Sequence, residues 1–196
     1  AQRIPLSIKD GDYDNILQEL SHHEPADVLI LLPWTQRLLA PESTQEALTS
    51  ELAFWETAWA HRQNAKLIQI GYDWTGPGPE GASLSGAPNG KIERIREMNR
   101  LLRSRLPPGA AWLDLEQLSG QEGRKHFYDP RQYHWTRNPF STAGLRALAH
   151  QLTASLRSIL TGPKKVLVLD LDNTLWGGIV GETGPFGISL RESPEG

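Results

Sequence analysis

Two aspartates, Asp170 and Asp172, follow directly on an apolar run from Val166 to Leu169. The run is short, β-branched at alternate positions and preceded by Gly162-Pro163, a pattern that predicts a strand buried on both faces, as in a parallel sheet. Because side chains alternate along a strand, both carboxylates would point the same way. They would do so at the carboxyl end of the strand, where open α/β sheets place their ligands.

Two carboxylates that converge on one point repel each other unless a cation lies between them. Mg²⁺ suits such a pair, since it takes a few oxygen ligands and completes its shell with water and phosphate oxygens. The first carboxylate, Asp170, could then attack a phosphorus atom while Asp172 moves a proton on or off the leaving oxygen. Thr174 could offer its hydroxyl and backbone N–H to the phosphoryl oxygens. The pattern therefore indicates phosphoryl chemistry.

Two other interpretations compete with this one. The aspartates could simply end a strand in a turn, with Asn173 helping, because acidic pairs after strands are common. A calcium-binding loop is excluded, since its sixth position, which must be glycine for a sharp turn, is Leu175 here.

The whole string from Val166 to Trp176 is more specific, and it closely resembles motif I of the haloacid dehalogenase (HAD) superfamily of phosphotransferases. The continuation through Gly184 to Ile188 resembles the FkbH-like branch. That branch is associated with loading a glyceryl unit, derived from a phosphorylated three-carbon acid, onto an acyl carrier protein in polyketide biosynthesis. The resemblance implies a Mg²⁺-dependent phosphatase (hydrolase) and glyceryl transferase.

The resemblance also implies a role for each motif residue. Asp170 would be the nucleophile and a Mg²⁺ ligand, and Asp172 the acid/base, which also lends its backbone carbonyl to the metal. The residues implied to contact phosphate or substrate are Thr174, Asn173, Trp176 and Gly177. The segment from Trp176 to Leu190, with a turn at Gly181–Gly184, is expected to form the flap hairpin that follows motif I.

Composition excludes several other classes of protein. Of the 196 residues, 38% are hydrophobic and 22% charged, as in a folded globular protein. The net charge of −3, without a basic run, argues against a nucleic-acid partner. No apolar stretch approaches the roughly 20 residues of a membrane span, and the start of the chain is not a signal peptide. The absence of cysteine excludes disulfides and thiol nucleophiles and fits a cytoplasmic location.

Hydrophobic periodicity predicts alternating strands and helices before the motif. Strands are expected at 4–9, 27–32, 65–71 and 110–115, and helices at 12–20, 43–59, 92–106 and 141–159. Ser43 and Glu46 form a capping box, and Ser141 caps the last helix. Residues 72–90 and 119–140 are expected to be irregular. The alternation predicts an α/β fold with a doubly wound parallel sheet.

A domain boundary is expected near Gly162, which divides residues 1–162 from 163–196. In FkbH-like proteins the region before the motif resembles the three-layer SGNH hydrolase fold. By that resemblance, the first strand is expected upstream of Ala1, and 163–196 would be the N-terminal fragment of an incomplete HAD domain. The superfamily's remaining catalytic residues are expected downstream of Gly196, so the fragment alone is expected to be inactive.

A hydrolase site within 1–160 has little support. SGNH enzymes need a serine after the first strand, and Tyr13 occupies that position in Gly11-Asp12-Tyr13. Their D-x-x-H pair is absent as well, because Asp129 and His134 stand five positions apart. A role for His134 stays open, and His126 is the weaker candidate.

The alternative to an enzyme is a non-catalytic module that docks a carrier protein or grips a substrate. A set of cations lies near aromatic residues, namely Arg124, Lys125, Arg131 and Arg137. Carrier proteins are acidic, so a local basic patch could steer them. The competing interpretation is four scattered, solvated side chains.

Overall fold

The structure of the chain is a computed structural model. It describes residues 5–11, 15–22, 24–40, 43–75, 87, 90–162, 166, 168, 170–172, 174–184 and 186–187. The chain divides into two compact units, Ala1–Thr161 and Gly162–Gly196. The division falls beside Gly162, whereas the assignment of each unit to a fold family stays a prediction.

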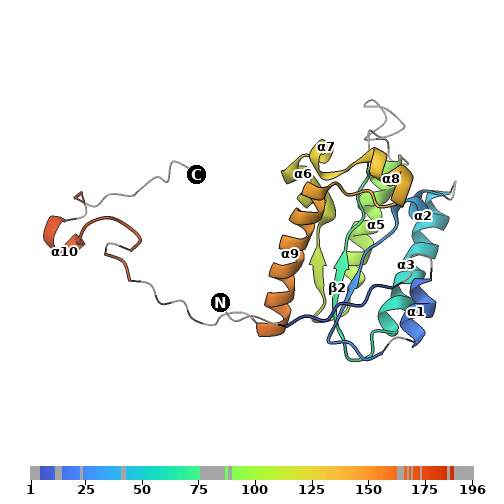
Figure 1. Cartoon of the computed structure of the whole chain (residues 1–196), viewed down its shortest axis with the longest axis horizontal. Coiled ribbons are helices and arrows are strands. Elements are labelled where there is room, and N and C mark those ends of the chain that lie inside the picture. Colours follow the sequence, from blue (N-terminus) through green and yellow to red (C-terminus); the bar gives the residue numbers. More distant parts are fainter. Residues whose placement is uncertain are drawn as a thin grey trace. The chain divides into compact units, whose positions relative to one another are not determined.

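Three parallel strands form the sheet of the first unit: β1 (Val28–Leu31), β2 (Lys66–Ile70) and β3 (Ala111–Leu113). Their order is β1-β2-β3, with Val28 opposite Lys66 and Ile68 opposite Ala111. The central strand is buried along 67–70 because helices cover both faces of the sheet (Figure 1). The predicted parallel α/β arrangement is confirmed, and its SGNH-like, doubly wound form remains a prediction.

Side chains alternate between two cores, one on each face of the sheet. Leu67 packs into a core with residues of α1 (Ile16–His22), α2 (Thr35–Leu39), α3 (Thr44–Ala60) and α5 (Lys91–Arg105). Ile68 and Ile70 pack into the other core with α6 (Leu115–Glu122), α7 (Arg124–Phe127) and α9 (Thr142–Thr161). Strand periodicity thus produces the two apolar layers.

The helix α3 follows its sequence signals closely. The Ser43 hydroxyl accepts the Glu46 N–H at 3.3 Å, which confirms the predicted cap. Leu48, Trp55 and Trp59 of the predicted stripe are buried, and Leu52 is half-buried. The two indoles are not purely apolar, because Trp55 donates to the Tyr72 hydroxyl at 2.6 Å and Trp59 to Gln69 Oε1 at 2.9 Å.

The predicted helices at 92–106 and 12–20 are present, with shifted ends. The first is α5, in which Ile92, Ile95 and Leu102 are buried. The second is α1, which begins at Ile16 and buries Leu20, while Asp12 lies outside the described residues.

The last helix of the first unit, α9, is capped as predicted by Ser141, whose hydroxyl accepts the Gly144 N–H at 3.0 Å. Leu148 is buried and packs with Leu152, Leu156 and Ile159. Leu145, predicted to join this stripe, is instead 40% exposed. The buried residues next to it in the helix are Gly144 and Leu148, which stand four positions apart on one face.

Residues 119–140, predicted to be irregular, are largely helical. They include the second half of α6, all of α7, and α8 (Pro130–Thr136). Asp114 accepts the Gln117 N–H at 3.0 Å and so starts α6, which also ends β3 at Leu113 instead of Leu115. Asp129 starts α8 in the same way, with Pro130 at the first helical position. Local capping therefore overrides the apparent lack of periodicity.

The strand predicted at 4–9 is wrong over its described residues. Residues 5–9 are irregular and exposed, and Ile4 lies outside the described part of the chain. A strand exists only where a neighbour accepts its backbone hydrogen bonds. Among the residues that the structure describes, β1 and β3 pair with β2 alone, so residues 5–9 add no fourth strand to the sheet.

The second unit also differs from the prediction. Val166 and Val168, expected in a buried strand, are 76% and 87% exposed. The expected turn of the flap hairpin is a short helix, α10 (Val180–Thr183). A lone strand or hairpin is marginal in water without a further apolar surface to cover it. The residues described within this unit supply no partner strand for Val166 and Val168.

Among the described residues, no helix is both long and apolar enough to span a bilayer.

Candidate functional site

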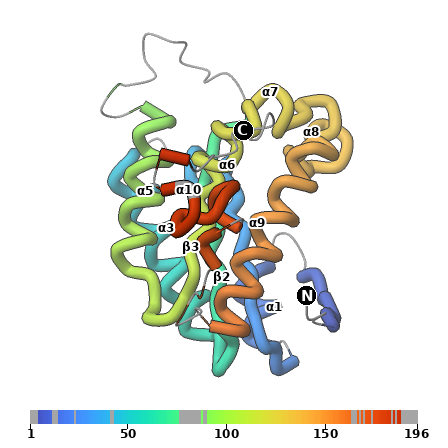
Figure 2. The backbone as a smooth tube through the Cα atoms, turned by 90° about the vertical axis from the view of Figure 1, so that its left-hand side faces the viewer, coloured from blue at the N-terminus to red at the C-terminus, as the bar shows by residue number. Residues whose placement is uncertain are grey.

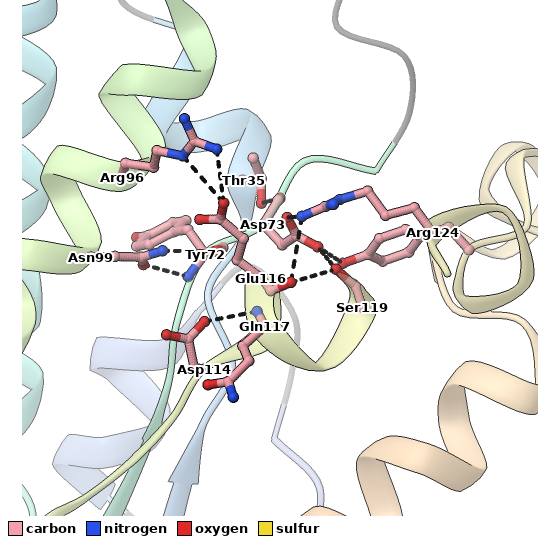
Figure 3. Close-up of polar contacts among 11 residues, drawn as sticks. Thr35, Tyr72, Asp73, Arg96, Asn99, Asp114, Glu116, Gln117, Ser119 and Arg124 are labelled. Carbon is pink, nitrogen blue, oxygen red and sulfur yellow. Dashed lines mark hydrogen bonds and ion pairs between the residues drawn. The ribbon is translucent and has the colours of Figure 1, made fainter. Parts of the chain in front are cut away.

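A buried carboxylate organises the carboxyl end of the sheet in the first unit. Asp73 follows β2 after Gly71 and Tyr72, and it is only 1% exposed. Helices α6, α7 and α8 gather at this end of the sheet (Figures 1 and 2). Three of the groups that contact Asp73 come from α6, α7 and the residue after α7, and a fourth from the start of α2 (Figure 3).

Each oxygen of Asp73 is bonded. The Tyr128 hydroxyl donates to Oδ2 at 2.7 Å, and the Ser119 hydroxyl donates to the same oxygen. Arg124 Nη2 donates to Oδ1 at 3.1 Å, and the Thr35 hydroxyl donates to the backbone carbonyl at 2.8 Å. A buried charge is costly unless it is paired and hydrogen-bonded. We call Asp73, Ser119, Arg124 and Tyr128 the Asp73 clamp, because it ties two helices to the end of β2.

The charge of Arg124 is paired inside the protein. Its guanidinium pairs with the fully buried Asp73 side chain and lies over the Trp74 ring, 4.0 Å from the centroid. The Nε atom is buried, and no described residue accepts its hydrogen. The prediction that Arg124 contributes to a free basic patch is therefore wrong, because Asp73 already neutralises its charge.

Burial sets the protonation state of Tyr128. Removal from water raises the pKa of its hydroxyl far above the usual value, and the negative charge of Asp73 raises it further. Tyr128 therefore remains protonated and donates to Asp73 throughout the ordinary pH range. The same causes, burial first and then Glu51, raise the pKa of Tyr72 well above its usual value.

The Asp73 clamp is not a hydrolase site. Ser119 is 0% exposed and its hydroxyl is bonded to a carboxylate and to the Glu116 carbonyl, whereas a nucleophilic serine needs access and a base. Asp129 accepts the N–H groups of Arg131 and Gln132 as the cap of α8. His134 is exposed, and Asp12 and Tyr13 lie outside the described residues.

A shallow hollow of about 440 Å³ opens beside the clamp along α6. Its charged lining consists of Asp114, Glu116 and Arg124. All three charges are already paired: Arg124 with Asp73, Glu116 with Arg96 at 3.2 Å and Asp114 with Arg103 at 3.8 Å, so the lining holds no uncommitted cation for a phosphate group. The first unit therefore offers no phosphate site at this position.

The motif residues lie in the second unit, in a tight turn. Leu175 donates its N–H to the Leu171 carbonyl at 3.0 Å, and Thr174 to the same oxygen at 3.4 Å. Asp172 Oδ1 accepts the Trp176 indole N–H at 3.1 Å and the Val180 backbone N–H at 3.2 Å. One carboxylate oxygen thus joins the turn to the start of α10.

The other predicted site residues differ in accessibility. Asp170 and Thr174 are exposed, so they can meet a substrate from solvent. Asp172, Trp176 and Gly177 are half-buried, and Asn173 lies outside the described residues. Gly178 has a φ of 105°, a conformation that favours glycine and allows the chain to turn after Trp176.

Sequence reasoning missed the Asp73 clamp completely. The prediction ended the third strand at Gly71 and placed 72–90 in one loop. The usable signal was Asp73 itself, a carboxylate two residues beyond a buried strand, which is where ligand or structural carboxylates gather in α/β sheets. Its three side-chain partners lie 46 to 55 residues further along the chain and carry no shared motif.

No protein-family model matches this chain, and no curated protein matches it. A solved structure that is similar to the chain is the N-terminal part of the protein BF1531 from Bacteroides fragilis, described as containing a phosphatase domain complexed with Mg. The TM-score is 0.71 at 21% identity, over 95% of this chain and 53% of that chain. The likeness shows a shared fold, and this chain spans about half the length of that structure.

Proposed function

We propose that the chain is part of a Mg²⁺-dependent HAD-type phosphatase whose reactive carboxylates are Asp170 and Asp172. The observation that carries the proposal is the D-x-D-x-T turn, in which Asp172 is anchored and Asp170 is exposed. The turn occurs in a chain whose fold resembles a structure described as containing a phosphatase domain with Mg.

The extent of the likeness supports this assignment. The first unit comprises 161 of 196 residues, about 82% of the chain, whereas the match covers 95%. The match therefore extends into the second unit, where the motif lies. A likeness confined to the first unit would have said nothing about residues 162–196.

The proposed reaction has two steps on this chain. An oxygen of Asp170 forms a bond to phosphorus as the bond to the leaving oxygen breaks, and Asp172 gives that oxygen a proton. Asp172 then takes a proton from a water molecule whose oxygen bonds to phosphorus, which frees phosphate and restores Asp170. The two hydrogen bonds to Asp172 Oδ1 hold its carboxyl in place for both transfers.

The donor set fits Mg²⁺. The described residues contain no cluster of three or more His, Asp or Glu side chains, so no dedicated protein cage is present there. Mg²⁺ is commonly held by one or two carboxylates plus water and substrate phosphate oxygens. The Asp170 carboxylate and the Asp172 backbone carbonyl would hold the ion, which neutralises charge on the phosphoryl group.

The finer assignment rests on the resemblance of 176–188 to the FkbH-like branch. We propose a phosphorylated three-carbon acid as the substrate and an acyl carrier protein as the acceptor of the glyceryl unit. A non-catalytic docking role for the first unit is the second candidate. The observation that favours it is helix α8, which contains no buried residue and belongs to the first unit and not to the motif turn. The cytoplasmic location stays a prediction.

Phosphate release from a phosphoglycerate by the whole protein tests the proposal. Asp170→Asn removes the nucleophile and a metal ligand, so we expect turnover with Mg²⁺ to fall at least about a thousandfold. Asp10→Asn, at another exposed aspartate, should leave turnover unchanged. Unchanged phosphate release in Asp170→Asn would remove the proposed function.

A calorimetric Mg²⁺ titration of the 196-residue chain is the companion measurement, since it needs no turnover. Asp170→Asn should weaken binding by about tenfold, because ligand charge sets the affinity of such sites. Equal binding by the wild type and this variant would place the metal elsewhere.

A further inference from the structure

Helix α8 directs a distinct set of side chains to the solvent. It contains no buried residue, and Trp135 is 90% exposed. Arg131, His134 and Trp135 are exposed at positions i, i+3 and i+4, which share one face of a helix. Exposed Arg137 follows at the end of the helix, three residues after His134. We call these four residues the α8 face.

The opposite side of α8 attaches the helix to the protein. Half-buried Tyr133 lies against Trp34, with ring centroids 6.1 Å apart. The segments before and after α8 are joined to each other. Tyr128 and Phe140 form a β-bridge, and the Asp129 N–H donates to the Pro139 carbonyl at 2.8 Å. The α8 face is therefore held in place before any partner arrives, which lowers the entropy cost of binding.

The charge around α8 is opposite to that of the rest of the chain. Residues 125–137 carry Lys125, Arg131 and Arg137 against Asp129, a net charge of +2. Since the whole chain carries −3, the remaining residues carry −5. Arg124 is left out of the patch because Asp73 neutralises it. An acidic partner would be attracted to this segment more than to the chain as a whole, which helps to orient the encounter.

We propose that the α8 face docks an acidic protein surface, with Trp135 as the apolar anchor and Arg131 and Arg137 as flanking cations. Exposed tryptophan and arginine are the residues most enriched among those that dominate binding energy. Three cations are too few to follow a nucleic-acid backbone, where phosphate contacts supply most of the affinity. A seven-residue helix is also short for lying in a membrane surface.

The identity of the partner rests on the proposed function, in which an acidic acyl carrier protein brings the acceptor. The docking itself does not, because it depends on residues of the first unit alone. The two can therefore fail separately. Asp170→Asn should abolish phosphate release by the whole protein and leave the affinity for the carrier protein unchanged.

Calorimetric titration of the 196-residue chain with an acyl carrier protein bearing its pantetheine arm tests the docking. Arg131→Glu and Trp135→Ala should each lower the affinity by about tenfold or more. The effect of Arg131→Glu should shrink as salt is added, and that of Trp135→Ala should not. Arg157→Glu, at an exposed arginine of α9, is the matched control and should change the affinity by less than about twofold.

Three outcomes would overturn the proposal. One is an equal loss of affinity in Arg157→Glu, which would mean non-specific attraction. Another is unchanged affinity in Trp135→Ala, provided that its thermal unfolding matches the wild type. The third is absence of carrier binding together with Arg131-dependent binding to vesicles containing phosphatidylserine or to duplex DNA, which would assign the face to a different class of partner.

Discussion

Asp73 is the residue on which the carboxyl end of the sheet depends. Its carboxylate is buried, and a tyrosine, a serine and an arginine satisfy it. Buried polar networks stabilise a fold only when every member has its partners. Loss of one donor destabilises the folded state, because the buried carboxylate is then incompletely hydrogen-bonded. The Asp73 clamp is therefore a sensitive point for stability, although it performs no chemistry in the proposed reaction.

Tyr128→Phe tests the clamp at pH 7. The change removes one donor to Asp73 and leaves the ring, so we expect the free energy of unfolding to fall by about 1–3 kcal/mol. Tyr133→Phe is the matched control, since Tyr133 is half-buried outside the clamp, and it should cost less. Denaturant unfolding monitored by circular dichroism measures both. Equal stability of Tyr128→Phe and wild type would show that the hydrogen bond contributes nothing.

The pH dependence provides the second part of this test. The pKa of the Tyr128 hydroxyl is raised in the folded protein. Above about pH 10 this hydroxyl is therefore ionised in the unfolded chain and still protonated in the folded protein. Ionisation then favours the unfolded state, and stability falls as pH rises above that point. In Tyr128→Phe this contribution is absent, so the decline above pH 10 should be less steep than in the wild type.

At the scale of elements, a close approach between α7 and α9 decides how the second core is packed. A Cβ at Gly144 would lie 2.1 Å from the backbone carbonyl oxygen of Phe127. Glycine is therefore required in the first turn of α9 for this helix to lie so close to the backbone of Phe127 in α7. Phe127 is itself buried, so the backbone it belongs to has little freedom to move away.

Gly144→Ala should therefore destabilise the first unit by about 1–3 kcal/mol, the usual cost of overpacking. Gly120→Ala is the matched control, because Gly120 lies in α6 and a Cβ there would meet nothing within 4 Å. That variant should be neutral or more stable by up to about 1 kcal/mol, as alanine favours helices. Chemical unfolding of both variants compares them, and equal stability would contradict the close packing.

The sequence was most informative about elements where local signals and burial agree. Ser43 and Ser141 cap the helices they were expected to cap, and β2 is the buried strand that its apolar run predicts. It was least informative between 115 and 137, where short helices depend on Asp114 and Asp129 as caps. Such helices are too short to show a hydrophobic period.

At the scale of the whole molecule, the two units differ in how much apolar surface they cover. In the part of the chain that the structure describes, the residues of both cores all lie before 162. In the second unit, Val166, Val168 and Phe186 are largely exposed. Since buried apolar area supplies most of the stability of a domain, the first unit should fold by itself.

A chain ending at Thr161 tests this independence. Because the described residues of both cores lie within this shorter chain, its melting temperature should lie within about 4 °C of that of the 196-residue chain. Scanning calorimetry of the two chains measures this. A much lower melting temperature for the shorter chain would mean that residues 162–196 stabilise the first unit.

The sequence by itself determined the alternation of strands and helices, the serine caps of α3 and α9 and the acidic motif at 170–174, because each depends on neighbouring residues. The tertiary structure decided what local patterns cannot carry. It showed that Asp73 is hydrogen-bonded by residues of helices distant in the sequence and that Arg124 forms an ion pair with it. It also showed that Val166 and Val168 are exposed and lack a strand partner among the described residues. Whether an apolar run is buried, or a charged residue is paired, depends on residues distant in the sequence that the fold brings next to it.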